Sequence, residues 1–382
     1  MTPVIPSGTP PAWAGELAGE ADPELVARIV RLAATTWATP ERIRQVVDTR
    51  LDGPTPTAAA VVETLERLAA AGRSLADEKA VAAAARALAA HRVRVRIPGE
   101  PGYPPRLLQA WPELGAPLWL FEWTADGALP DGPAVAVVGT RHPTLDGVAT
   151  ARELAAHLAR HGVTVVSGMA RGIDQAAHLG AIEAGGRTVG VLGAGFGVDY
   201  PRRDGAVRQS VWRAGGLLTE LLPGTPPRKR TFLWRNRIIA GLSDMTVVVE
   251  GRSGSGALHT ARMAISQGRD VMAVPGPVRS PTSRAPLDLI RDGATPLTRI
   301  DDVTDALGIA ALLAPSPDDT TPPGLSTTAG TVLPLLGASP AQPAALAAQT
   351  GATIPAVMAA IAELTARGLA AGTPRGVVRV RP

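Results

Sequence analysis

The sequence predicts an α/β protein built on a doubly wound parallel β-sheet, with a small helical domain before the sheet and a winged-helix-like module after it. Two observations support this class. From residue 134 onward, short apolar runs alternate with helical stretches, which is typical of a parallel sheet covered by helices on both faces. A proline-rich stretch then separates these repeats from a C-terminal segment with three short helical patterns.

Length and composition narrow the classes of protein. A chain of 382 residues suits two or three domains. The chain has no cysteine, which excludes disulfides, thiolate catalysis and cysteine-ligated zinc. Residues 1–6 have neither the basic nor the apolar part of a signal peptide, and no run reaches the ~18 apolar residues of a membrane span. We therefore expect a soluble cytoplasmic protein.

Basic residues are concentrated in the middle of the chain. Residues 133–310 carry 21 basic and 15 acidic side chains, and residues 202–237 alone hold nine basic residues against two acidic ones. Such a segment attracts polyanions, because each neutralised phosphate releases condensed counterions. The alternative is a solvated surface in an arginine-rich protein, since only two of the 38 basic residues are lysines.

The N-terminal third is predicted to be helical. Residues 1–20 are rich in Pro, Gly and Ala and are expected to be a flexible lead-in. Residues 21–96 are expected to form a small helical domain of the SAM or helix-hairpin-helix kind, because Asp22-Pro23 and Thr39-Pro40 place a proline at the first position of a helix. Residues 97–132 are expected to be an irregular connecting segment whose aromatic side chains pack against the next domain.

The predicted sheet domain covers residues 133–312. Its six buried strands are expected at Ala134–Val138, Val163–Ser167, Thr188–Leu192, Gly216–Thr219, Met245–Glu250 and Val271–Val274. Each is followed by a glycine-containing turn and a helical segment, for example Asp146–Arg160, Gly172–Ala184 and Gly256–Gln267. In such sheets ligands bind at the carboxyl ends of the strands, where helix N-termini present free N–H groups.

The C-terminal segment is predicted to be a separate module. Residues 313–328 have linker composition. In residues 329–382, helical patterns at 329–336, 341–349 and 354–367 precede a short strand or wing near 375–380. Three short helices and a hairpin indicate a winged helix.

Three glycine-bearing turns follow strands of the predicted sheet, and each contains an arginine. They are Val138–Arg141, Ser167–Asp174 and Glu250–Gly256. Glycine permits close approach of the backbone, and the guanidinium group offers forked donors for phosphate. Taken singly, each is more simply explained as a tight strand-to-helix turn. Three such turns on one sheet favour an anion site.

Basic and aromatic residues interleave in Arg228–Arg237. This is the pattern that single-stranded nucleic acid requires, because charges follow the backbone while rings stack on bases. Five of the twelve aromatic residues lie between 196 and 234. The alternative is that Phe232 and Trp234 anchor a helix in the core, and at least one of them is expected to do so.

Enzymatic motifs are not supported. Lys79 and Lys229 lie outside any Gly-Lys-Ser/Thr sequence, so there is no P-loop, and Gly193–Gly197 has the wrong glycine spacing for a dinucleotide fingerprint. The six histidines form no paired metal-binding motif. Asp174 and His178 share one predicted helix face. They are either an acid/base couple or, as we favour, a turn-positioning carboxylate and a structural histidine.

Seven stretches in order carry a family resemblance: Val135–Arg141, Ser167–His178, Val191–Pro201, Arg235–Ser243, Val247–Ser255, Gly268–Gly276 and Leu289–Ala294. The string Arg-Asn-Arg-Ile-Ile-Ala-Gly-Leu-Ser is highly specific. Between Tyr103 and Leu307 the chain resembles the DNA-processing protein A family (DprA, also called Smf). The resemblance implies an extended Rossmann-type fold that binds single-stranded DNA in a basic pocket and forms a homodimer. It also implies recruitment of a RecA-type recombinase onto incoming DNA in natural transformation.

By that resemblance Arg141 would hold a DNA phosphate, and Lys229 and Phe232 would line the same pocket. Together with the turn analysis this predicts the following DNA- and phosphate-binding residues: Gly139, Thr140, Arg141, Ser167, Gly168, Arg171, Gly172, Lys229, Phe232, Arg235, Asn236, Arg237, Ser253, Gly254 and Ser255. No catalytic residue, cofactor, metal ligand or membrane contact is predicted.

Two departures from the family pattern matter. Thr282–Asp288 replaces a glycine-rich stretch, which puts the adjacent surface, including a dimer interface, in question. The presumed recognition helix 354–367 carries Arg367 as its single basic residue, which argues against base readout in duplex DNA. Two rival functions stay open. One is a phosphoribohydrolase-like Rossmann enzyme, although Ser253–Thr260 lacks its catalytic glutamate. The other is a transcriptional regulator that uses residues 328–382.

Overall fold

The computed structural model describes residues 10–50, 56–71, 74–110, 116–125, 129–130, 132–201, 204–308, 325–336, 341–373 and 376–379. The chain forms two compact units, residues 1–309 and residues 310–382, and each is described by itself.

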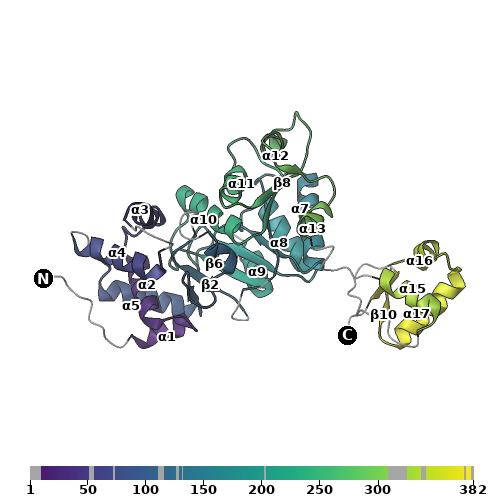
Figure 1. Ribbon diagram of the computed structural model, residues 1–382, viewed down its shortest axis with the longest axis horizontal. Coiled ribbons are helices and arrows are strands. Elements are labelled where there is room, and N and C mark those ends of the chain that lie inside the picture. The colour runs from purple at the N-terminus through teal and green to yellow at the C-terminus, as the bar shows by residue number, and fades with distance from the viewer. Residues whose placement is uncertain are drawn as a thin grey trace. The chain divides into compact units, whose positions relative to one another are not determined.

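The first unit begins with five helices, coloured purple to blue in Figure 1. They are α1 (Ala12–Ala18), α2 (Pro23–Ala34), α3 (Pro40–Arg50), α4 (Ala58–Ala70) and α5 (Glu78–Ala90). Side chains that accept backbone N–H groups cap three of their starts, because the first amides of a helix have no internal partner. Asp22, Thr57 and Asp77 accept the amides of Glu24, Ala60 and Ala80.

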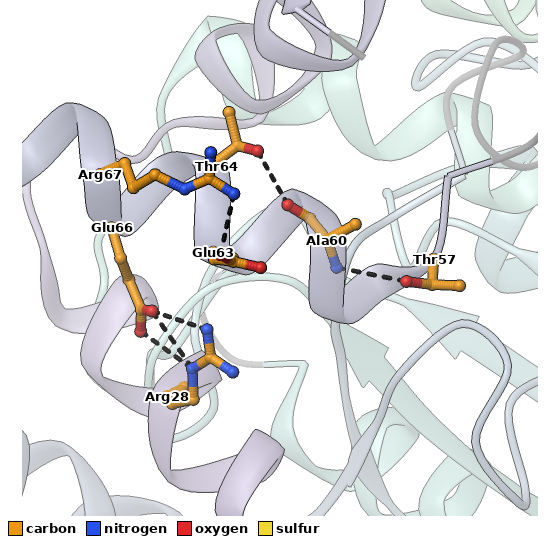
Figure 2. Close-up of polar contacts among 7 residues, drawn as sticks. All are labelled: Arg28, Thr57, Ala60, Glu63, Thr64, Glu66 and Arg67. Carbon is orange, nitrogen blue, oxygen red and sulfur yellow. Dashed lines mark hydrogen bonds and ion pairs between the residues drawn. The ribbon is translucent and has the colours of Figure 1, made fainter. Parts of the chain in front are cut away.

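A bidentate ion pair between Arg28 and Glu66 joins α2 to α4, as Figure 2 shows. The Nε and Nη2 atoms of Arg28 donate to both carboxylate oxygens of Glu66 at 2.7–3.2 Å. Glu66 is only 11% exposed. One turn away, Arg67 contacts Glu63 on the solvent side of the same helix, where both side chains are at least 60% exposed. The inner pair therefore connects two helices, whereas the outer pair lies within one.

A sheet of nine strands, counted over the described residues, follows these helices. The strands are β1 (Arg94–Arg96), β2 (Leu120–Trp123), β3 (Ala134–Val138), β4 (Thr164–Ser167), β5 (Thr188–Val191), β6 (Gly215–Thr219), β7 (Met245–Val248), β8 (Asp270–Ala273) and β9 (Thr295–Pro296). Their order across the sheet is β1-β2-β6-β5-β4-β3-β7-β8-β9. From β6 to β9 all neighbours are parallel, and β1 and β2 are antiparallel additions at one edge. The predicted fold class is confirmed.

Helices cover both faces of the sheet. They are α6 (Pro105–Leu108), α7 (Leu145–Arg160), α8 (Ile173–Glu183), α9 (Gly205–Ala214), α10 (Lys229–Gly241), α11 (Gly256–Ser266), η1 (Pro281–Ser283), α12 (Arg284–Arg291) and α13 (Asp302–Ala306). Strand β3 shows why its apolar run is continuous. Ala134, Ala136 and Val138 pack into one core with residues of α10 and α11, while Val135 and Val137 pack into another with α7 and α8, since successive side chains point to opposite faces.

Residues 97–132 differ from the irregular connection that the sequence predicts. Leu120–Trp123 forms β2, which pairs antiparallel with both β1 and β6. The side chains of Val95 and Phe121 enter one core together with residues of α2, α4 and α5. The helical N-terminal part thus packs against the β1–β2 edge, which Figure 1 shows beside α2 and α5.

The second unit has three helical segments followed by a hairpin, as predicted. These are α15 (Thr327–Val332) with η2 (Leu333–Leu335), α16 (Pro343–Thr350), α17 (Ile354–Ala366), and the antiparallel pair β10 (Ala370–Thr373) and β11 (Gly376–Arg379). Val332, Leu346, Val357 and Leu364 lie in its core. Of the segment 375–380 predicted as a strand or wing, residues 375 and 380 lie outside the described residues.

Among the described helices, none is by itself long and apolar enough to span a bilayer. The sharply bent pair Pro343–Thr350 and Ile354–Ala366 meets that test only when its two helices are taken together.

Candidate nucleic-acid interface

The sheet has one point at which the order of its strands reverses. After β3 the chain adds β4, β5 and β6 outward on one side, and it then returns to place β7 and β8 on the other side of β3. The turns that follow β3 and β7 therefore diverge at the carboxyl edge, and such a switch point leaves a crevice for ligands. The amide of Thr140 donates to the carbonyl of Glu250 at 2.7 Å, which joins the two turns at the base of the crevice.

A groove of about 680 Å³ occupies this edge. Among the described residues, ten of the fifteen predicted site residues line it: Gly139, Thr140, Arg141, Lys229, Phe232, Arg235, Asn236, Ser253, Gly254 and Ser255. The lining residues that were not on the predicted list include three with ionisable side chains, namely His142, Asp174 and Arg252. Arg252 is the arginine of the third glycine turn, so the pattern that singled out Arg141 also pointed to it.

Three exposed cations face the groove without a carboxylate partner. Arg141, Lys229 and Arg252 are all exposed, and no ion pair joins any of them to an acidic group among the described residues. By contrast, Arg230 lies in the same basic segment but reaches Glu41 at 3.3 Å. The charge of the three groove cations is therefore available to an anion.

Phe232 presents a half-exposed ring in the middle of these charges. The guanidinium carbon of Arg141 lies 5.2 Å from the ring centroid, and the ring of Tyr200 lies 5.0 Å away. The lack of a side chain at Gly193 makes room for the ring, because a Cβ there would lie 2.5 Å from Phe232 Cδ1. Thr231 fixes the same contact by donating its hydroxyl to the Gly193 carbonyl at 2.6 Å.

Arg235 is a buried cation beneath the groove. Its guanidinium donates to the carbonyls of Gly168 and Val191 at the ends of β4 and β5 and to Asn236 Oδ1 at 3.2 Å. Burial lowers the pKa of Arg235 to about 10, and the nearby carboxylate of Asp174 opposes that shift. The group therefore stays charged at neutral pH and adds positive potential under Phe232.

Asn236 anchors the neighbouring helix. Its side-chain amide donates to the Gly256 carbonyl at the start of α11 at 3.1 Å. In the third turn, Ser255 caps α11 by accepting the Leu258 amide at 3.4 Å. Ser253 and Gly254 are exposed, and the φ of +73° at Gly254 suits glycine. The backbone of this turn lies beside the N-terminus of α11, where amide groups favour an anion.

The second glycine turn, Ser167–Gly172, differs from its expected role. Its amides are already used, because Asp174 accepts those of Gly168 and Ala170 at 3.1 and 3.3 Å. The buried hydroxyl of Ser167 donates to the Val137 carbonyl at 2.6 Å. Ala170 lines the groove, whereas the predicted residues Ser167, Gly168, Arg171 and Gly172 do not.

Two further arginines also lie apart from the groove cations. The exposed side chain of Arg171 lies 3.5 Å from the carboxylate of Asp204. Arg237 is buried, and its guanidinium donates to Glu220 at 2.6 Å. At Gly172 a Cβ would collide with the Thr140 carbonyl, so this glycine lets the second turn pack against the first.

The contacts of Asp174 and His178 are those of structural residues and not of an acid/base couple. Burial raises the pKa of Asp174, although Arg235 and the two amides pull it down. His178 is fully buried and its Nδ1 contacts the hydroxyl of Thr188 at 2.7 Å. No hydrogen bond joins the two side chains among the described residues.

Comparisons with known proteins identify the family of the chain. Residues 94–308, more than half of the chain, match the family described as DNA recombination-mediator protein A, and residues 315–374 match the DprA winged helix domain. The Smf protein of Escherichia coli is 36% identical over 293 residues, which cover 73% of this chain and 75% of that protein.

Two further relatives support the same assignment. A putative DNA processing protein DprA of Mycobacterium tuberculosis is 46% identical over 181 residues, and this match spans about half the length of either protein (47% and 46%). The crystal structure of DNA processing protein A from Streptococcus pneumoniae aligns with a TM-score of 0.55 and 27% identity over 73% of this chain and 96% of that one. The chain belongs to the DNA recombination-mediator protein A family, also called DprA or Smf.

Proposed function

We propose that the groove binds the sugar-phosphate backbone of single-stranded DNA. Arg141, Lys229 and Arg252 would contact phosphates, and the exposed amides of the Ser253–Ser255 turn would add neutral donors. A base of the strand would stack against Phe232, where the ring is open to solvent. In a duplex the bases are already stacked and paired, so a stacking site of this kind favours a single strand.

The observation that carries the proposal is the grouping of three unpaired cations around one half-exposed ring at the strand-order switch. Unpaired surface cations alone would bind any polyanion. The ring, held against Gly193 and flanked by Tyr200, adds the stacking surface that distinguishes a base from a simple phosphate.

Fluorescence anisotropy of a labelled oligonucleotide, measured across salt concentrations, tests this proposal. We expect single strands to bind more tightly than duplexes of the same sequence, with affinity falling as salt rises. Equal affinity for both forms, or an affinity indifferent to salt, would contradict it.

Substitution of Arg141 gives the residue-level test. Arg141→Ala is expected to weaken binding about tenfold or more, because hydrogen bonds to charged groups typically contribute about 1.5–3 kcal/mol. It should also reduce the salt slope by about 0.7, the value for one lost phosphate contact on a single strand. The melting temperature should stay unchanged, since Arg141 is exposed.

Two arginines serve as matched controls for Arg141. Arg171→Ala removes a turn arginine that pairs with Asp204, and Arg213→Ala removes an exposed arginine of α9 outside the groove. Both should bind DNA nearly as the parent chain does. A loss as large as that of Arg141→Ala in either control would mean that binding follows total charge and not the groove.

We further infer that the chain hands the bound strand to a RecA-type recombinase as a homodimer during natural transformation. The description of the matched family as a recombination mediator supports this step. Recombinase filament formation on strands precoated with single-strand-binding protein should be faster with this chain than without it, and Arg141→Ala should remove the effect. Analytical ultracentrifugation should show a dimer.

We also infer that the chain catalyses no reaction. Asp174 is the single acidic side chain that lines the groove among the described residues, and two backbone amides already occupy its carboxylate. The rival phosphoribohydrolase function needs a free carboxylate at this edge. Release of free base from a nucleoside monophosphate by the purified protein would overturn the inference.

A further inference from the structure

A second cavity lies on the other side of the loop that carries Tyr200. It has a volume of about 310 Å³ and shares no lining residue with the groove. Four aromatic side chains line it: His91, Trp123, Phe196 and Trp212. We call this cavity the aromatic pocket. Its volume is at the lower end of the range for small-molecule sites.

The four rings come from separate parts of the first unit and converge on Trp123. The centroid of Trp123 lies 5.2 Å from that of His91, 5.5 Å from that of Phe196 and 5.4 Å from that of Trp212. His91 follows α5, Trp123 ends β2 and Trp212 lies on α9. His91, Trp123 and Trp212 are only partly buried. Phe196 is 1% exposed and belongs to the core, so the three partly buried rings supply the accessible aromatic surface of the pocket.

Glycines bring the backbone close to this hollow. Gly197 has a φ of +79°, which favours glycine over residues with a side chain. A Cβ at Gly197 would lie 3.5 Å from His91 Nε2. The loop thus leaves the pocket open where a larger residue would narrow it.

The polar groups of the pocket indicate a neutral ligand. The indole Nε1 of Trp212 is buried and has no hydrogen-bond partner among the described residues, and such a donor normally has an acceptor. Gln209, which also lines the pocket, is exposed and offers an amide. Arg208 already donates to the carbonyls of Val198 and Tyr200 at 2.9 and 2.8 Å, and its charge lies 3.8 Å from Asp199.

We propose that the aromatic pocket binds one nucleobase, as a planar, uncharged ring with hydrogen-bond acceptors. The base would come either from a DNA strand or from a free nucleoside, because the same ring chemistry fits both. Aromatic walls stack on any base, and the exposed amide of Gln209 can exchange hydrogen bonds with a ring nitrogen or carbonyl. The proposal does not depend on the groove, since none of its residues line it.

The fluorescence of 2-aminopurine, which falls when the base stacks, tests the proposal. Titration of the full chain into free 2-aminopurine deoxyriboside should give saturable quenching that unlabelled deoxyadenosine reverses. Trp212→Leu should weaken this binding roughly 5- to 150-fold, the equivalent of one lost stacking contact of about 1–3 kcal/mol. Trp37→Phe, which alters a tryptophan bonded to the Ser74 carbonyl, is the matched control and should bind normally.

Three comparisons separate this site from the groove. Binding of the free nucleoside should change little with salt, should persist in Arg141→Ala, and should gain nothing from a 5′-phosphate. If only 2-aminopurine within an oligonucleotide is quenched, and Trp212→Leu removes that quenching, the base comes from the strand. Absence of quenching with both probes, or quenching that survives in Trp212→Leu, would overturn the proposal.

Photo-crosslinking keeps the test decisive if Trp212→Leu fails to fold. A chain irradiated with 5-iododeoxyuridine, free or in an oligonucleotide, should carry the label on peptides that contain His91, Trp123 or Trp212. Labelling confined to other peptides would contradict the assignment.

Discussion

The buried His178 has a defined tautomer. The hydroxyl of Thr188 donates to the Val165 carbonyl at 2.7 Å, so it must accept its second hydrogen bond from Nδ1 of His178 at 2.7 Å. The Nε2 atom is then unprotonated, and it has no partner among the described residues. Burial, and secondarily the charge of Arg235, lower the pKa of His178 to about 3. A proton on this ring would be a buried cation without an acceptor.

This tautomer predicts a loss of stability in acid. The unfolded chain protonates its histidine near the ordinary pKa of ~6.5, whereas the folded chain does not until about pH 3. Between these values the unfolded state binds more protons, so the free energy of unfolding falls as the pH is lowered. From pH 7.5 to pH 5 this one group should remove about 2 kcal/mol. Asp174, whose pKa is raised by burial, acts in the opposite direction.

Urea unfolding at pH 7.5 and pH 5 measures the effect of His178. In His178→Gln the difference between the two pH values should shrink by about 2 kcal/mol, whatever stability the substitution itself removes. His142→Gln, at an exposed histidine, is the control and should keep the parent difference. An unchanged difference in His178→Gln would show that the buried ring is not the source.

Residue type and local motif identify candidate binding residues in the sequence, but they do not show which of these residues are buried. Arg141 and Lys229 line the groove as predicted, whereas Arg237, only eight residues after Lys229, is buried against Glu220. Lys229 and Arg237 are basic residues of one segment, and the sequence does not show which face of α10 meets the sheet. Ser167 and Gly168 have the composition of an anion-binding turn, but the carboxylate of Asp174 and the Val137 carbonyl take their donors.

At the scale of elements, the strength of helix pairing depends on which ion pair is shielded from water. The Arg28–Glu66 pair between α2 and α4 is bidentate, and both side chains are largely shielded from solvent. The Arg67–Glu63 pair within α4 is open to solvent, where such pairs typically contribute about 0.3–0.5 kcal/mol. Figure 2 shows both pairs on α4.

A double-mutant cycle should separate the two pairs. Arg28→Ala and Glu66→Ala, singly and together, should give a coupling of about 1–3 kcal/mol, because bidentate charge-assisted bonds are stronger and less screened. The matched cycle with Arg67→Ala and Glu63→Ala should give ~0.5 kcal/mol or less. Chemical denaturation at low and high salt provides the measurement, and equal couplings in both cycles would refute the distinction.

The predictability of elements follows their length and burial. The strands β3 to β8 are short, mainly apolar runs that are buried except at Asp270, and their positions were predicted within one or two residues. β1 and β2 have three and four residues, too few to show alternation, and proline and tryptophan around them resemble a loop. Thr282–Asp288, a departure from the family pattern, supports the groove: the Thr282 carbonyl accepts the Gly251 amide at 2.6 Å.

At the scale of the whole molecule, the charge and the groove belong to the first unit. Residues 133–310 carry 21 of the 38 basic side chains, and residues 311–382 carry four. In the second unit, α17 exposes apolar side chains, with Ile354 52% and Met358 50% exposed. α17 itself contains no basic residue, and Arg367, which follows it, lies 3.7 Å from Glu363. A helix of this composition lacks the donors that read base edges in the major groove.

Removal of the second unit should therefore leave the affinity for single strands unchanged within about twofold. The reason is that the phosphate contacts, which set the salt-dependent part of the affinity, are proposed to lie in the groove of the first unit. The comparison is between the full chain and a chain that ends at Gly308, by anisotropy with the same labelled strand and with a duplex of mixed sequence. An unchanged melting temperature of the first unit is the control, because the cores of that unit contain no described residue after Leu307.

The full chain and the truncated chain should also show the same sequence preference on duplex DNA, because α17 lacks the side chains that read base edges. A tenfold loss on single strands, or a duplex preference that disappears with the second unit, would place part of the DNA-binding surface on the winged helix.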